Sequence, residues 1–111
     1  MTLTTTTVTG AVPLPNGLAP HGAVLRFALS GFDLDGAVIA PVPVDIAISD
    51  AGEIETPLWP NARGLRETHY TVALVLAAGF GFPERQIRLG RITVPEAENA
   101  PLHELLLAGE G

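Results

Sequence analysis

Few side chains of this sequence could act as nucleophiles. The chain contains no cysteine, and its only serines are Ser30 and Ser49. Neither serine lies in the G-x-S-x-G turn that exposes the nucleophile of many hydrolases. Covalent catalysis needs a nucleophile, a base and an orienting group within reach of one another. Because the sequence offers no such set, we expect no catalytic residues and a protein that is not an enzyme.

Histidines and carboxylates are the remaining candidates for chemistry, as metal ligands. His103-Glu104 begins like a zinc-binding helix motif, but Leu107 stands where the second histidine would be. The segment 33–36, Asp-Leu-Asp-Gly, begins like a calcium loop, but the later ligands of an EF-hand are missing. Asp and Gly are also the common residues of turns. The sequence therefore predicts a solvated histidine and a turn, with no metal and no cofactor.

The charge balance restricts the class of partner. Twelve Asp and Glu against six basic residues give a formal net charge of −6. Nucleic acids and anionic membranes attract clustered cations, so we expect neither as a partner. The first 25 residues carry no charged side chain. We expect this stretch to pair with other strands or with a partner protein.

Short segments with apolar residues at every second position dominate the chain, which is typical of half-buried strands. In the last strand the inward-pointing residues are first the odd-numbered Ile87 and Leu89 and then the even-numbered Ile92 and Val94. This change of phase needs one extra residue, so we expect a bulge near Gly90. Leucines at helical spacing after Pro101 predict a short helix over residues 101–107. The expected strands span residues 4–12, 23–29, 38–40, 42–49, 53–58, 69–77 and 86–94.

This pattern predicts an all-β protein. About seven short strands joined by turn signals indicate a single antiparallel β-sandwich of the immunoglobulin-like or transthyretin-like kind, with a short C-terminal helix. We expect residues 1–97 to form the sandwich domain and residues 98–111 to form a tail that carries the helix.

Two apolar groups are candidates for contact with a partner protein. Phe80 and Phe82 stand in a Gly-rich segment between two strands, where we expect a hairpin tip. They either fold back over the end of the core or serve as an apolar anchor. Leu102, Leu105 and Leu106 share one face of the predicted tail helix, which needs a surface to dock on.

A loop between two predicted strands has a residue pattern suited to a fixed conformation. Asn61 can hydrogen-bond to the backbone, Gly64 permits a left-handed conformation, and Arg63 can bridge carbonyls or a carboxylate across the loop. The Tyr70 hydroxyl can reach the loop backbone, as in a tyrosine corner. The alternative is a ligand-binding loop built on Trp59, Asn61 and Arg63. The structural motif comprises Trp59, Pro60, Asn61, Arg63, Gly64 and Tyr70.

The segment 58–72 reads LWPNARGLRETHYTV. It resembles an L-W-P-N-x-x-G-x-x-x-T-x-Y motif in small β-sandwich modules of tailed-phage virion proteins. These modules are similar to carboxypeptidase-regulatory or transthyretin-like domains, and they occur near the attachment ends of tail fibres and head spikes and in phage-like gene transfer particles. The segments 8–12, 27–33 and 89–95 agree with the resemblance, which covers nearly the whole chain.

The resemblance implies a structural component of a phage or phage-like virion. Since the sequence ends at Gly111, where a fibre would continue into a shaft, we expect an adaptor, base or decoration protein that anchors a fibre or spike. Its partners would be capsid, tail, fibre or spike subunits, with homo-oligomers in the particle. It would be located in the virion after synthesis in the host cytoplasm. The alternative is a carbohydrate-binding or accessory module of an extracellular protein.

Overall fold

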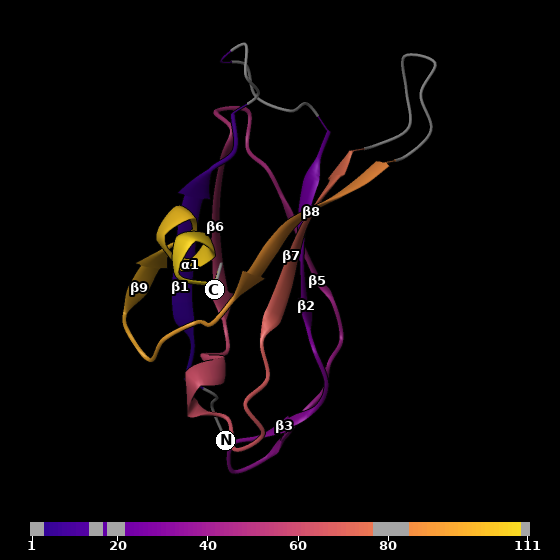
Figure 1. Cartoon of the computed structure of the whole chain (residues 1–111). Helices are drawn as coiled ribbons and strands as arrows, with labels where there is room; N and C mark the ends of the chain where they lie inside the picture. Colours follow the sequence, from indigo (N-terminus) through magenta and orange to yellow (C-terminus); the bar gives the residue numbers. More distant parts are fainter. Residues whose placement is uncertain (1–3, 14–16, 18–21, 77–84, 110–111) are drawn as a thin grey trace.

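The chain folds into a mostly β structure with one short helix at the C-terminal end (Figure 1). The computed structural model describes residues 4–13, 17, 22–76 and 85–109. The elements are β1 (Thr6–Ala11), β2 (Val24–Leu29), β3 (Asp33–Leu34), β4 (Val38–Ile39), β5 (Val44–Ala47), β6 (Glu53–Leu58), the 3₁₀ turn η1 (Asn61–Arg63), β7 (Tyr70–Leu76), β8 (Arg85–Ile92), β9 (Asn99–Pro101) and α1 (Leu102–Gly109).

The strands form two main sheets that pack together, and this confirms the predicted β-sandwich with its C-terminal helix. One sheet has the order β6-β1-β9 and the other the order β5-β2-β7-β8, while β3 and β4 form a separate short hairpin. Every strand pair is antiparallel except β1–β9, which is parallel. The all-antiparallel arrangement expected from the sequence is therefore incorrect for this one pair.

The core lies between the two main sheets and follows the period-two pattern of the sequence. On β2, Leu25, Phe27 and Leu29 are buried and alternate with half-buried residues. On β6, Ile54 and its neighbours at every second position are buried, whereas Glu53 and the residues in step with it are exposed. Burial of these side chains contributes most of the folding free energy, because each large apolar group removed from water is worth about 1.5–3 kcal/mol.

The predicted bulge in the last strand is confirmed. Val72 pairs with Gly90 and the next residue of β7 pairs with Arg88, so Leu89 is the extra residue on β8. Gly90 has a φ of 149°, a conformation that favours glycine. After the bulge Ile92 and Val94 are buried, as expected. Ile87, expected to point inward, is instead 43% exposed and belongs to the first half of β8, in which residues 85–88 are all exposed.

Two stretches of the uncharged N-terminal segment, residues 6–11 and 24–25, are paired with strands of the same chain. Strand β1 lies between β6 and β9. The buried hydroxyl of Thr6 donates a hydrogen bond to the carbonyl oxygen of Pro95 at 2.7 Å and accepts one from the amide of Ala97 at 3.3 Å. The amide of Thr7 donates to the carbonyl oxygen of Glu98 at 3.1 Å. β1 therefore fixes the segment that leads into the tail.

The tail is built into the same core as the two sheets. β9 pairs with β1, and α1 packs against β1, β8 and β9 (Figure 1). Leu102 is only 3% exposed and lies against Gly10, where an added Cβ would come within 3.0 Å of the Leu102 Cβ. Leu102, expected at a partner contact, is therefore a core residue. No helix in the described ranges is long and apolar enough to cross a membrane.

We predict that Leu102→Ala lowers the free energy of unfolding by about 2–4 kcal/mol, because it leaves a cavity between α1 and β1. Leu107→Ala is the matched control, since Leu107 lies on the same helix and is 73% exposed. We expect it to change stability by less than about 0.5 kcal/mol. Urea unfolding followed by circular dichroism measures both. Equal effects of the two substitutions would mean that α1 is not docked in solution.

Candidate functional site

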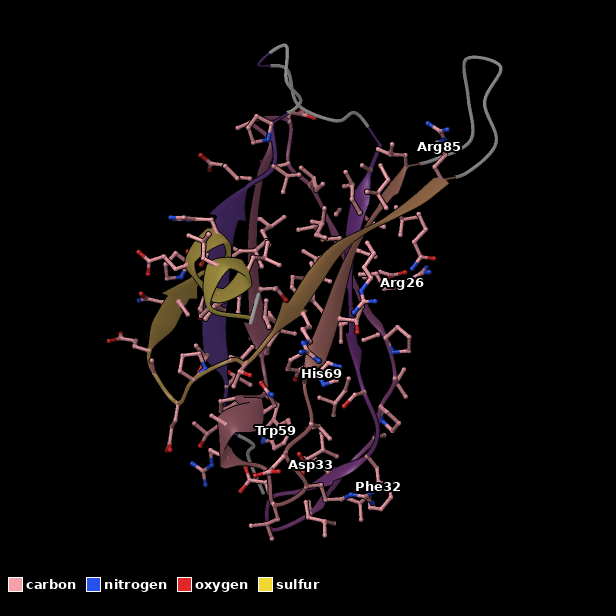
Figure 2. All side chains as sticks on the ribbon, viewed as in Figure 1. Arg26, Phe32, Asp33, Trp59, His69 and Arg85 are labelled. Carbon is pink, nitrogen blue, oxygen red and sulfur yellow. The ribbon has the colours of Figure 1, made fainter. Side chains whose placement is uncertain are left out.

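The residues of the L-W-P-N motif converge at one end of the sandwich. Pro60 precedes η1, and the loop after it approaches the β3–β4 hairpin (Figure 1). Figure 2 shows Trp59 and Asp33 lying near each other at this end. Several hydrogen bonds join the two segments. We call this group the Asp33 network; it comprises Asp33, Asp35, Trp59, Asn61, Arg63, Gly64, Arg66, Thr68 and Tyr70.

Asp33 is the centre of the network. Its carboxylate is fully buried and accepts hydrogen bonds from the amides of Leu34 (2.8 Å) and Arg66 (2.9 Å) and from the hydroxyl of Thr68. Burial opposes ionisation of the carboxyl group, but these hydrogen bonds outweigh it and hold the pKa of Asp33 below its usual value. The ionised carboxylate therefore joins the hairpin to the loop 64–68.

Gly64 is required because the loop backbone passes directly over the Asp33 carboxylate. A Cβ added to Gly64 would lie 2.0 Å from Asp33 Oδ2. The backbone of Gly64 has φ −69° and ψ 149°, an extended conformation that any residue adopts. The expected left-handed conformation of Gly64 is therefore wrong, and close approach is the reason for a glycine. The positive φ in this loop belongs to Glu67 instead, at 55°.

The second carboxylate of the hairpin holds the tryptophan. Trp59 is 5% exposed, and its indole N–H donates a hydrogen bond to Asp35 at 2.9 Å. Arg63 forms ion pairs with Asp35 at 3.2 Å and with Glu96 at 2.9 Å. The predicted bridging role of Arg63 is thus confirmed. These contacts connect η1 to the hairpin on one side and to the segment after β8 on the other.

Asn61 and Tyr70 fix the loop backbone. The Asn61 side chain is 2% exposed; it donates to the carbonyl oxygen of Thr68 at 2.5 Å and accepts from the amide of Val94 at 2.6 Å. The Tyr70 hydroxyl donates to the carbonyl oxygen of Trp59 at 2.8 Å, as predicted. Burial raises the pKa of Tyr70 to about 12, so the phenol keeps its proton to a higher pH than a solvent-exposed tyrosine does.

The Asp33 network fixes the conformation of the hairpin and of the loop that contacts it. Among the described residues, every buried side-chain nitrogen and oxygen has a hydrogen-bond partner. Both carboxylates of the hairpin are engaged by donors of the chain itself, so the resemblance of 33–36 to a calcium loop reflects a turn. Within the described ranges no three His, Asp or Glu side chains are grouped as metal ligands. Trp59, Asn61 and Arg63 serve the loop conformation and do not form an open ligand site.

The sequence did not predict the central role of Asp33. Its Asp-Leu-Asp-Gly pattern predicts a turn, which β3–β4 forms, but not the bonds to residues more than thirty positions away. Thr68 belongs to the L-W-P-N-x-x-G-x-x-x-T-x-Y pattern, and this was the available signal.

A second surface was missed altogether. The hairpin, the chain leading into β5 and the loop after η1 expose large apolar side chains. We call this group the apolar surface; it comprises Phe32, Leu34, Val38, Val42, Val44 and Leu65. Leu34 and Val38 pair across the hairpin, and the Arg66 guanidinium carbon lies 3.8 Å from the centre of the Phe32 ring. The available signal was the segment 36–44, GAVIAPVPV, which has no charged residue.

The other predicted contact residues are placed as follows. Leu105 and Leu106 are half-buried and pack against the core, and His103 on the same helix is exposed. Phe80 and Phe82 lie outside the described residues. The described members of the predicted partner-binding set are therefore the leucines of α1, which lie together on one helix.

Neither protein-family models nor curated proteins provide a match for this chain.

We predict that Gly64→Ala lowers the free energy of unfolding by about 3 kcal/mol, because the new methyl group displaces the Asp33 carboxylate from its donors. Gly31→Ala is the matched control, since nothing lies within 4 Å of its added Cβ. We expect little change from it. Thermal and urea unfolding of both variants test this, and comparable stabilities for the two would contradict the close approach at Gly64.

We predict that Asp33 makes the fold sensitive to acid. Because its pKa is lower in the folded chain than in the unfolded chain, its stabilisation is complete above the unfolded value of about 3.9 and is lost as pH falls through the folded value. Asp33→Asn should destabilise the chain by about 1–3 kcal/mol at pH 7, and the difference from the unsubstituted chain should shrink below pH ~4. Unfolding free energies measured from about pH 2 to 7 check this; a constant difference would contradict it.

Proposed function

We propose that this chain is a non-catalytic structural component of a phage or phage-like virion, acting as an adaptor, base or decoration protein that anchors a fibre or spike. The observation that carries the binding role is the apolar surface. The virion assignment rests on the resemblance of residues 58–72 to the motif of phage β-sandwich modules. The two together favour a module that docks on other proteins of a particle.

The apolar surface is suited to protein contacts. Val38, Val42 and Leu65 are 71%, 67% and 78% exposed, so most of their area is available for burial. Removal of apolar area from water is worth about 25 cal/mol per Å². Large exposed apolar side chains grouped on neighbouring segments of a soluble protein are candidates for sites of interaction. Pro41 and Pro43 stand on either side of Val42 and restrict the backbone there, which lowers the entropy cost of docking.

The Asp33 network supports this role by fixing the position of the surface. Phe32 and Leu34 flank Asp33, and Leu65 lies between Gly64 and Arg66, both of which contact Asp33 or its donors. The exposed side chains are thus presented from a hydrogen-bonded frame. On a symmetric particle, many such weak contacts would act together and give strong attachment.

The carbohydrate-binding alternative has less support. Sugar rings stack on open aromatic faces, but Trp59 and Tyr70 are both 5% exposed. Phe32 is 43% exposed, yet the Arg66 guanidinium lies over its ring. The aromatic side chains of the described residues therefore favour packing over sugar recognition.

The proposal predicts that the chain co-sediments with particles made by cells that encode it, and that V42E/L65E abolishes most of this association. Two carboxylates on the apolar surface would have to be desolvated on docking. Density-gradient fractions of an induced lysate, analysed by mass spectrometry and immunoblotting, measure the association. Leu107→Glu is the matched control, because it places the same charge on an equally exposed leucine of α1.

Three outcomes would count against parts of the proposal. Absence of the unsubstituted chain from particle fractions would contradict the virion role. Unchanged association of V42E/L65E would exclude the apolar surface as the contact. Loss on Leu107→Glu alone would move the contact to α1.

A further inference from the structure

Strand β8 has an open edge in its first half. It is the last strand of the order β5-β2-β7-β8, and among the described strands its pairing partner is β7 alone. Residues 85–88 are all exposed, whereas the half after the bulge is partly covered. Figure 2 shows Arg85 at the far end of the sheet, away from the Asp33 network. The exposed half therefore offers a strand edge outside the surface described above.

The hydrogen-bond pattern shows which backbone groups face the open edge. The amide of Ser30 donates to the carbonyl oxygen of His69 at 2.8 Å, so the odd-numbered residues of β7 bond to β2. The even-numbered residues of β7 bond to β8, and Ile87 stands opposite one of them. The amides and carbonyls of its neighbours Gln86 and Arg88 are consequently directed away from β7, toward the open edge.

Strand β8 carries a local excess of arginines, although the protein as a whole is acidic. Arg85, Arg88 and Arg91 are three of the six arginines of a chain whose net charge is −6. All three are exposed, and among the described residues they form no ion pair. Arg26, on β2 of the same sheet, is by contrast paired with Asp45 at 2.8 Å. Within the described part of the chain, the edge thus combines backbone groups that have no strand partner with arginines that form no ion pair.

We infer that the first half of β8 binds an extended acidic segment of a partner protein by strand addition. The partner's backbone pairs with Gln86 and Arg88, and its carboxylates reach Arg88 and Arg91. The apolar side chains on the opposite face of the partner strand contact Ile87, which is 43% exposed. A second copy of β8 is a poor occupant, because antiparallel self-pairing would set arginines against one another. This inference does not depend on the virion assignment.

The test uses a fluorescent peptide of roughly eight residues that alternates Glu with Val, added to the ¹⁵N-labelled full chain. We expect saturable binding with amide shifts concentrated at residues 85–88. The charge reversal R88E/R91E should weaken binding about tenfold, because two attractive contacts become repulsive. The same peptide with Lys in place of Glu should not bind. Circular dichroism confirms that the variant stays folded.

Strand addition is separated from simple charge attraction by a peptide N-methylated at alternate residues, which keeps the carboxylates but cannot pair. It should bind much more weakly, and equal binding would overturn the inference. Absence of shifts at 85–88 with the Glu-Val peptide at millimolar concentration would also overturn it. So would preference for a single-stranded oligonucleotide over the peptide, or dimerisation of the chain through β8 in sedimentation velocity.

Discussion

The buried Asp33 carboxylate is the constraint on which one end of the molecule depends. A charged group removed from water is tolerated only when donors surround it, and here two amides and one hydroxyl do so. Those donors come from the hairpin itself and from a loop more than thirty residues later. The requirement for space above the carboxylate then explains Gly64. One desolvated charge therefore determines both the path of the loop and its composition.

The remaining contacts of the network extend this constraint to the sheets. Tyr70 is the first residue of β7 and holds the backbone of Trp59, which directly follows β6. Asn61 holds Val94 beyond β8. Strands of both main sheets are thus tied to one loop. The exposed apolar side chains next to this loop are consequently held in place. A partner therefore binds a preformed surface, and little entropy is lost in ordering that surface on binding.

Two surfaces of different chemistry lie on the same sandwich. The apolar surface lies around the β3–β4 hairpin and β5. The open edge with its exposed arginines lies on β8, at the opposite side of the β5-β2-β7-β8 sheet. A protein that connects two different partners needs two such surfaces. The first surface would contribute affinity through burial, and the second would contribute orientation through backbone pairing and charge. The arrangement is consistent with an adaptor.

Residue alternation by itself determined the sandwich, most of its strands and the bulge at Gly90, because each depends on local periodicity and on nearby turns. The residue types of Asn61, Arg63 and Tyr70 predicted their structural roles, although the sequence left a ligand-binding loop as the alternative. Only the tertiary structure decided that β9 runs parallel to β1, that Leu102 belongs to the core and that Gly64 is needed for space. These features depend on residues far apart in sequence, where an Asp at 33 and a Gly at 64 carry no local sign that they touch. Burial and contact are properties of the packed chain, and a linear pattern does not contain them.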